Sequence, residues 1–565
     1  RSFWARWLNI QADEAKLFLW VAGLYFLMAS SNMILDNFVE TTFLRRYGVE
    51  NLPLVYMANS VVAFFSMGAL MGLMIRYPSG RLLRDMMICF GVMMALLRIV
   101  VGLEISLVYP LLFLLRSQVQ VLNAMVFWNL ANDLFNTRQS KRIFPLVSAA
   151  GMLGGILASA GTPWLNRLLA LDNFMLAYAV LAIAAAAVVW RISVLFPPLT
   201  LTERSTSRAK RERTSMVKEI KNVWPLMKTS TLVLIMVLIT FLPNILIPIM
   251  NYIFNFTVSQ SFGTEQGMLA FFGYFRAFLS TISFIILMFV GKIYNRWGLP
   301  VALMFHPANY VIAFLGLLLH FDLVVAMYAR ISTQVLRDTI NNPAREVLMG
   351  LFPPKNRAVL KTFLRGTVVR IGIVLGSGAT MLAEDVFHPR YLSIIGIVLG
   401  TAWLLSAIWL KKAYSRILLD LISQDMVDLK SLERSDMDDL FQDKKAQAQL
   451  LQACAASEGH ACVWFAEVMR SQKVPDLDEQ LLAMLPGKQE ATAIELLDMI
   501  SPQAAAQALP VFRQLAASGR PGLTAALARA AARMDQPEGQ EFLRGLLEDH
   551  QPPLVKGRRA KFYYL

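Results

Sequence analysis

Apolar segments of roughly the 20 residues needed to cross a bilayer fill the first three-quarters of the chain. They lie at residues 16–35, 53–75, 84–103, 107–133, 143–166 and 173–196, and again at 230–256, 266–291, 299–318, 321–344, 358–383 and 390–412. Backbone surrounded by lipid must satisfy its own hydrogen bonds, so segments of this length form helices. We therefore expect an all-α polytopic membrane protein with twelve transmembrane helices in two pseudo-symmetric six-helix halves.

Composition and charge exclude an ordinary soluble enzyme. The 565 residues are 56% hydrophobic and 16% charged, whereas soluble proteins are about 45–50% apolar and about 25% charged. Lys and Arg gather in alternate short loops, so the net charge of +15 indicates membrane topology rather than nucleic-acid binding. We expect an integral protein of the bacterial inner membrane, in contact with its lipids, with both termini in the cytoplasm.

The character of the chain changes at several points. Residues 1–15 predict an interfacial amphipathic helix, 16–200 and 230–414 the two transmembrane halves, and 201–229 a basic cytoplasmic linker. From residue 415 to 565 the chain has Ala- and Leu-rich amphipathic helices broken by Pro and Gly. These predict a cytoplasmic helical-repeat domain, HEAT-like, whose extended surface suits a protein partner.

One polar pattern occurs twice inside the apolar helices. The segments RSQVQVLN (116–123) and RISTQVLRD (330–338) each place an arginine four residues before Gln-Val-Leu. Residues at this spacing share a helical face, and a charge at membrane depth is costly unless it faces a bundle interior or a wet cavity. The duplication predicts a transporter body with a polar pathway at its pseudo-symmetry axis.

Offsets of three and four residues extend both stripes along their helices. The predicted substrate-binding residues are Arg116, Gln120, Asn123, Arg330, Gln334, Arg337, Asn341 and Arg345. Arginine donates parallel hydrogen bonds to phosphate or carboxylate and stays charged, so we expect an anionic substrate. The alternative is that these arginines pair with Asp36, Glu40 or Asp338 and hold the halves together. Arg276 also lies within an apolar segment.

Three motifs resemble those of known transporters. FWNLANDLFNTRQSKRIFPL (127–146) resembles the signature of the ATP/ADP translocase family, and GKIYNRWG (291–298) resembles the loop signature of the major facilitator superfamily. The segment 341–377 is similar to the translocases' Asp-Pro-Thr-Lys-Glu region, with Pro343 and Glu346 matching and Arg345 in place of lysine. The resemblance covers residues 16 to about 412. It implies the fold of the major facilitator superfamily and the transport of nucleotides.

The first span departs from that family. In those translocases an Arg-Asp-Thr-Lys-Asp stretch of the first span supplies a nucleotide-binding lysine. The corresponding segment of this chain, MILDNFVETTFLRR (33–46), has Asp36 and Glu40 but no lysine. The missing cation removes a charge-assisted contact of about 1.5–3 kcal/mol. ATP/ADP exchange therefore does not carry over directly.

Residues for gating or coupling are expected near the same motifs. The predicted set is Asp36, Glu40, Asp133, Lys141, Arg142 and Glu346. Asp133 stands at the acidic position of the translocase signature, where it either pairs with Lys141 or Arg142 or caps the end of its helix.

The cluster Cys454-x5-His460-x-Cys462 has a spacing unlike that of a zinc ribbon. We interpret these cysteines as buried thiols and expect no metal site. The sequence has no Walker A loop, no GxGxxG after a strand, no HExxH and no nucleophile elbow, so we expect neither an enzyme nor a cofactor.

Three functions fit these patterns. The first is a secondary transporter, by exchange or ion coupling, of an anionic and phosphate-bearing small molecule, with nucleotides as the family default. The second is a translocator of a lipid or other anionic amphiphile. The third is a non-transporting membrane scaffold that recruits a partner through residues 415–565. A scaffold has no reason to keep two Arg-x3-Gln-Val-Leu stripes, which favours transport.

Overall fold

The chain folds into two compact helical units in a computed structural model. The first unit comprises Arg1–Met349 and Pro354–Lys411, and the second Gly350–Pro353 and Lys412–Leu565. The structure describes residues 14–423 and 451–548, except for residues 104, 136, 197–222, 226, 228–229, 298, 351–353, 385, 453, 472–473, 475, 502–504, 518–520 and 534–536. The expected interfacial helix at 1–15 and basic linker at 201–229 therefore lie almost entirely outside the described residues.

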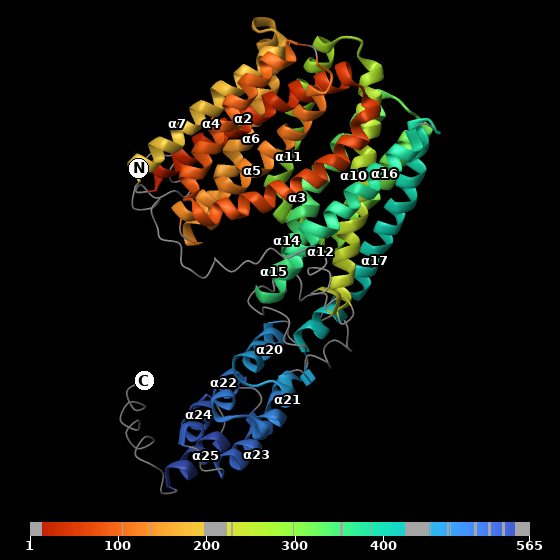
Figure 1. Cartoon of the computed structure of the whole chain (residues 1–565). Helices are drawn as coiled ribbons and strands as arrows, with labels where there is room; N and C mark the ends of the chain where they lie inside the picture. The colour runs from red at the N-terminus through yellow and green to blue at the C-terminus, as the bar shows by residue number, and fades with distance from the viewer. Residues whose placement is uncertain are drawn as a thin grey trace. The chain divides into compact units, whose positions relative to one another are not determined.

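The first half of the transmembrane unit is a bundle of six long helices (Figure 1). They are α2 (Ala15–Thr42), α3 (Leu52–Arg76), α4 (Ser79–Val101), α5 (Val108–Leu134), α6 (Thr137–Leu168) and α7 (Phe174–Leu195), and the π-helix η1 (Phe43–Tyr47) continues α2. Helix α2 packs against α5, α6 and α7, and α4 packs against α5 and α7.

The second half repeats this arrangement with more interruptions. Its helices are α10 (Thr231–Ser261), α11 (Glu265–Trp297), α12 (Leu299–Leu319), α13 (Leu323–Leu336), α14 (Asn342–Gly350), α15 (Pro354–Phe363), α16 (Val369–Glu384) and α17 (Leu392–Ser423). Two π-helices, η5 (Arg337–Asn341) and η6 (Leu364–Val368), join α13 to α14 and α15 to α16. The halves meet where α11 packs on α2 and α6, and where α16 packs on α3.

The all-α prediction is confirmed, since the described residues contain helices and no strand. Nine of the helices that the structure describes are long and apolar enough to cross a membrane. Helix α4 falls short because it carries Arg81, Arg84, Asp85 and Arg98. Helices α13 and α16 have 14 and 16 residues, because π-helices divide the expected spans at 321–344 and 358–383.

The same close helix approach occurs in both halves at a glycine. A Cβ on Gly154 of α6 would lie 2.5 Å from the Phe26 carbonyl oxygen of α2, and a Cβ on Gly376 of α16 would collide with the Ile245 backbone of α10. Without a side chain at these positions the helix backbones come into contact, which is how membrane helices commonly pack. The two halves thus share a packing rule as well as a helix order.

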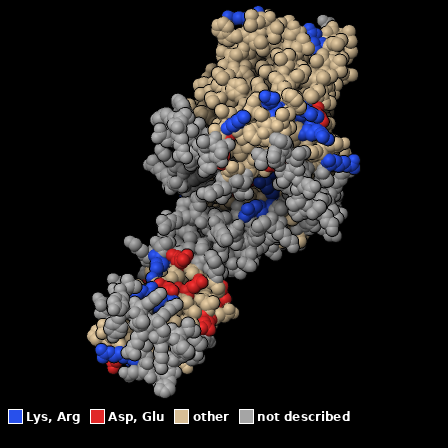
Figure 2. All heavy atoms as spheres, turned by 90° about the vertical axis from the view of Figure 1, so that its left-hand side faces the viewer, with Lys and Arg blue, Asp and Glu red and all other residues tan. Residues whose placement is uncertain are grey.

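Apolar side chains cover much of the outside of the first unit. Leu168, Leu382, Phe65, Ile99 and Val180 are all exposed, as expected where lipid replaces water. The face of the first unit that Figure 2 shows is largely uncharged, and its Lys and Arg side chains lie in separate groups.

The second unit consists of short helices packed in alternation. They are α20 (Gly459–Ser471), α21 (Leu477–Met484), α22 (Glu490–Met499), α23 (Ala505–Ala516), α24 (Pro521–Ala532) and α25 (Pro537–Glu548). Helix α22 packs between α20 and α24, while α21 packs on α23. The HEAT-like repeat stays a prediction.

Candidate functional site

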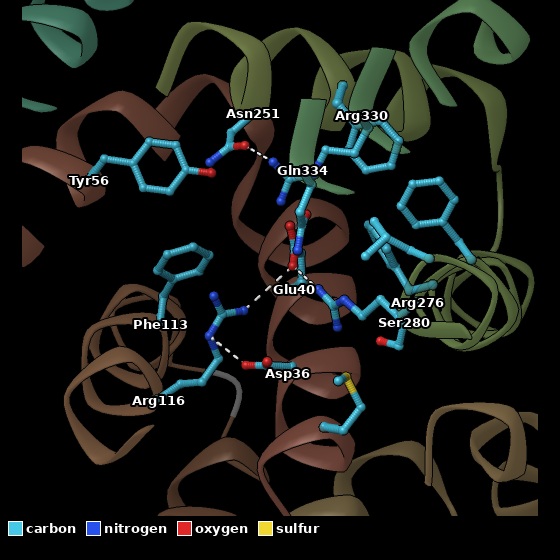
Figure 3. A pocket seen from close by; sticks show the side chains of 15 residues that line it. Asp36, Glu40, Tyr56, Phe113, Arg116, Asn251, Arg276, Ser280, Arg330 and Gln334 are labelled. Atoms are coloured by element: carbon cyan, nitrogen blue, oxygen red, sulfur yellow. Dashed lines mark hydrogen bonds and ion pairs between the residues drawn. The ribbon is translucent and has the colours of Figure 1, made fainter. Parts of the chain in front are cut away.

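A polar cavity of about 220 Å³ lies where the two transmembrane halves meet. Helices α2, α3 and α5 line it from the first half and α10, α11 and α13 from the second (Figure 3). Its charged and polar lining residues are Asp36, Glu40, Tyr56, Arg116, Asn251, Arg276, Ser280, Arg330 and Gln334. The rest of the lining is Met33, Phe113, Phe254, Phe272, Phe275 and Leu279. Residues of both Arg-x3-Gln-Val-Leu motifs therefore line the same cavity.

Arg116 of the first motif is neutralised within its own half. Its Nε lies 3.0 Å from Oδ1 of Asp36, and its Nη1 lies 3.6 Å from Oε2 of Glu40. Asp36 and Glu40 are four residues apart, so α2 presents both carboxylates on one face. The guanidinium carbon also lies 4.5 Å from the centre of the Phe113 ring, within the range of a cation–π contact.

Glu40 also binds an arginine of the other half. Arg276 of α11 forms an ion pair with the Glu40 carboxylate, and its Nη1 donates to Oδ1 of Asn37 at 2.6 Å. The Asn37 amide donates in turn to the Thr162 hydroxyl of α6 at 2.9 Å. Glu40 is thus a counter-ion shared between the halves, as Figure 3 shows.

Arg330 of the second motif differs from the other two arginines. Its Nη1 donates a hydrogen bond to Oδ1 of Asn251 on α10, and its guanidinium carbon lies 5.7 Å from the centre of the Phe254 ring. In the described part of the chain no carboxylate forms an ion pair with it. Three guanidinium groups and two carboxylates line the cavity, which leaves one positive charge in excess among the described residues.

The stripe predicted on the second motif is interrupted after Gln334. Arg337, Asn341 and Arg345 are absent from the cavity lining. The π-helix η5 covers residues 337–341, and its extra residue per turn changes the helical position of the residues that follow it, Arg345 among them. The spacing of three and four residues therefore does not continue unchanged beyond the π-helix, and a substrate-binding role for Arg337, Asn341 and Arg345 stays a prediction.

Arg337 and Asn341, which do not line the cavity, have other surroundings. Arg337 pairs with its neighbour Asp338, Nε to Oδ1 at 3.0 Å. Asn341 is buried, and its Oδ1 has no hydrogen-bond partner among the described residues.

On the first motif only the arginine reaches the cavity. Gln120 and Asn123 do not line it. Asn123 is fully buried, and neither atom of its amide has a hydrogen-bond partner in the described part of the structure. The structure therefore brings together Arg116, Arg330 and Gln334 from the predicted substrate set, with Asp36 and Glu40 from the predicted coupling set.

Asp133 and Glu346, the other predicted coupling residues whose side chains the structure describes, do not line this cavity. Oδ2 of Asp133 accepts a hydrogen bond from the Ser79 hydroxyl at 2.6 Å, whereas the Lys141 and Arg142 side chains lie outside the described residues. Glu346 pairs with Lys361 at 2.9 Å and with Arg365. Burial raises the pKa of the Glu346 carboxyl, but these two cations outweigh burial and hold that pKa below its ordinary value.

A second set of contacts joins the halves at the end of α2. Arg46 of η1 pairs with Asp172 of the first half at 2.8 Å and with Glu265 at the start of α11 at 2.6 Å. The adjacent Arg45 donates to the Gly263 carbonyl oxygen at 2.6 Å. We call Arg45, Arg46, Asp172 and Glu265 the latch, because they connect the halves at this end of the bundle.

Several cavity and latch residues were not among the predicted site. Arg276 had a signal, since it is a charge within an apolar helix. Tyr56, Asn251 and Ser280 had none, because a single polar residue in an apolar segment does not show which way it faces. Within the described residues no group of three or more His, Cys, Asp or Glu side chains gathers as a metal site would.

Comparison with protein families supports the fold and its class. The family model described as TLC ATP/ADP transporter matches residues 43–340. The chain belongs to this family. The match includes every charged residue of the cavity except Asp36 and Glu40. TLC-family membership makes the protein a membrane transporter by class, and no curated protein matches the chain.

A solved transporter structure shows the same fold. The chain is similar to a mutant of the nucleoside transporter NupG, with a TM-score of 0.50 and 15% identity over 69% of this chain and 99% of that one. The inward-open xylose transporter XylE from E. coli has a TM-score of 0.45 and 12% identity, over 70% of this chain and 95% of that one. At 15% identity the NupG likeness shows that this TLC-family chain has the fold of such transporters, and nothing about its substrate.

Proposed function

We propose that this TLC-family protein is a secondary transporter of an anionic, phosphate-bearing small molecule, with nucleotides as the first class to test. The observation that carries the proposal is Arg330. It lines the cavity between the halves and, in the described structure, has an amide rather than a carboxylate as its partner. A substrate anion would be the counter-ion of this guanidinium, whose planar donors match a phosphate or carboxylate.

The shared carboxylate supports a mechanism of alternating access. Glu40 contacts Arg116 in one half and Arg276 in the other. A substrate anion that enters beside Arg330 competes with Glu40 for these guanidinium groups and loosens the ion pair across the halves. The latch at Arg46 must open separately, because it joins the halves at the end of α2.

The size of the cavity constrains the bound state. At about 220 Å³ it is smaller than typical ligand sites of about 300–1,000 Å³. It suits an anionic head group in this conformation, and a larger substrate would require the halves to move apart. The Phe254, Phe272 and Phe275 rings would then contact the rest of the molecule.

An anionic amphiphile is the second candidate. The observation that favours it is the apolar part of the lining, in which six aromatic and aliphatic side chains surround the charged groups. Such a surface accepts an acyl chain as readily as a nucleobase. The missing first-span lysine also weakens the case for a polyphosphate.

Orientation and location complete the proposal. The alternate distribution of Lys and Arg supports cytoplasmic termini, and a bacterial inner membrane fits the same pattern. The C-terminal unit would then be a cytoplasmic HEAT-like domain that recruits a protein partner, since its short helices pack in alternation.

Ligand-dependent thermal stabilisation of the detergent-purified protein tests the proposal, because ligands that bind the folded state raise Tm. ATP, ADP, sugar phosphates and phospholipids are titrated at fixed salt, and the ligands that shift Tm are then tested for uptake into proteoliposomes. We expect a shift that Arg330→Gln removes and Arg337→Gln keeps, since Arg337 lies seven residues further on and already pairs with Asp338. A shift with lipids alone would select the amphiphile. If neither class of ligand changes Tm, the proposal that the protein transports an anion is wrong.

A further inference from the structure

Two cysteines of the second unit face each other across a tight helical hairpin. Cys454 lies in the helical turn at 454–456, residues 457–458 form the bend, and α20 begins at Gly459 and contains Cys462. The two Sγ atoms are 3.6 Å apart. Each thiol also lies near the other's backbone, with Cys462 Sγ donating to the Cys454 carbonyl oxygen at 3.2 Å and Cys454 Sγ to the Cys462 carbonyl oxygen at 3.5 Å.

The neighbouring helix holds this hairpin in place. The Gly459 amide donates to the Thr492 hydroxyl of α22 at 2.8 Å. The Lys488 ammonium donates to the carbonyl oxygens of Cys454 and Ala455 at 2.9 and 2.7 Å, where the exposed carbonyls of a helix end favour a cation. The sulfur atoms are therefore positioned by contacts outside the hairpin.

The environment makes the two thiols unequal. Hydrogen bonding with Cys454 and the Lys488 ammonium lower the pKa of the Cys462 thiol to about 7, whereas hydrogen bonding with Cys462 and burial raise the pKa of the Cys454 thiol. Because the thiolate is the reactive form, Cys462 is the nucleophile of the pair. Cys454 is the partner that remains protonated.

We propose that Cys454 and Cys462 form a reversible peroxide-sensitive dithiol, with Cys462 as the reacting thiol and Cys454 as the resolving thiol. Both side chains are buried, which favours a small oxidant such as hydrogen peroxide over a larger one. The inference concerns the second unit alone and does not depend on the transported substrate.

The chemistry balances with peroxide as the sole oxidant. The Cys462 thiolate attacks one peroxide oxygen, the O–O bond breaks, and a sulfenic acid and one water form once a proton is taken up. The Cys454 sulfur then attacks the Cys462 sulfur, the S–O bond breaks, and the hydroxyl leaves with the Cys454 proton as a second water. Two thiols are oxidised to one disulfide and one peroxide is reduced to two waters. A dithiol reductant reverses the reaction by exchange.

The test treats the folded full-length protein with hydrogen peroxide and removes the peroxide. The protein is then unfolded in denaturant with N-ethylmaleimide to block free thiols, and its peptides are mapped by mass spectrometry. We expect a Cys454–Cys462 disulfide that a dithiol reductant removes. Cys454→Ser should instead accumulate a sulfenic acid at Cys462 that dimedone traps, and Cys462→Ser should leave Cys454 unmodified. Cys89→Ser is the matched control and should form the disulfide at the same rate, because Cys89 lies in α4.

The pH dependence gives a readout that a purely structural thiol pair would not show. In Cys454→Ser the Lys488 ammonium remains, so the rate of dimedone-trapped oxidation at Cys462 should rise with pH as the thiolate forms. Lys488→Gln should shift that rise to higher pH, and Lys488→Arg should shift it less. If both thiols stay alkylatable after peroxide treatment, or Cys462 is overoxidised while Cys454 stays free, the proposal is wrong.

Discussion

Arg116 and Arg330 begin the same Arg-x3-Gln-Val-Leu motif in two halves of one duplicated bundle, yet their surroundings are opposite. Arg116 on α5 has two carboxylate partners from α2. Arg330 on α13 has the amide of Asn251 from α10, and α2 and α10 are the first helices of their halves. The identical motifs therefore face different charges. Within the described residues, one arginine is paired with carboxylates and the other with an amide.

This difference explains why the two interpretations of the arginines, substrate binding and structural pairing, are each supported by one motif. Arg116 shows the ion pairs expected of a residue that holds the bundle together. Arg330 shows what is expected of a binding residue, a guanidinium with no carboxylate partner among the described residues. A role argued from the motif alone would have assigned both arginines the same task.

The largest expected effect tests the paired side of the comparison. Arg116→Gln takes the cation away from the Asp36 carboxylate and removes one cation from Glu40, and breaking a buried ion pair typically costs about 3–5 kcal/mol. Unfolding of the detergent-purified variant should show a strongly lowered Tm. The control is Arg84→Gln, which removes an exposed pair with Asp85 and should leave Tm nearly unchanged. An unchanged Tm for Arg116→Gln would contradict the structural role of Arg116 and, with it, the difference proposed between Arg116 and Arg330.

The same change on the other motif should act on binding instead. Arg330→Gln removes a charge-assisted contact of about 1.5–3 kcal/mol, which is roughly a 10- to 150-fold rise in Kd for the anion. Its Tm without ligand should change little, because no ion pair within the described structure is broken. Affinity and uptake are measured on the same preparation as Tm. Arg330→Lys should retain part of the affinity, and undiminished binding in Arg330→Gln would contradict the assignment.

Giving Arg330 a counter-ion should make the two motifs alike. Asn251→Asp places a carboxylate where the amide now accepts a hydrogen bond from Arg330. This carboxylate competes with the substrate anion for Arg330, so the Kd of the anion should rise by about tenfold, or about 1.4 kcal/mol. Asn309→Asp on α12 is the control, since Asn309 binds Ser332 and is not part of the cavity lining. Tighter anion binding in Asn251→Asp would show that Arg330 is not the anion's partner.

The smallest effect concerns the glutamines of the two motifs. Gln334 lines the cavity and Gln120 does not. A neutral hydrogen bond contributes about 0.5–1.5 kcal/mol, so Gln334→Ala should weaken binding by roughly 2- to 12-fold. Gln120→Ala should leave Kd unchanged. Equal losses in the two variants would mean that both glutamines contact the substrate in a conformation other than this one.

Much of the fold followed from the sequence because the bilayer imposes a length and an apolar composition on each span. The arginine–glutamine pairs were also predictable, since a spacing of four places Arg330 and Gln334 on one face. The π-helix at 337–341 was not, because no residue pattern marks the extra residue that changes the spacing between Arg337 and Arg345. The partners of Arg116 and Arg330 come from helices far away in the chain, so Asn251 carried no local sign of its role.

The single excess positive charge among the described residues of the cavity has an electrical consequence. When the halves of a transporter exchange their exposure, an uncompensated charge moves through part of the membrane field, at about 2.3 kcal/mol per elementary charge per 100 mV for a full crossing. A bound monovalent anion cancels that charge, so the loaded protein reorients without this electrical work. The membrane potential should then distinguish empty from loaded reorientation, and we expect currents in reconstituted membranes to reveal it through their dependence on the counter-substrate.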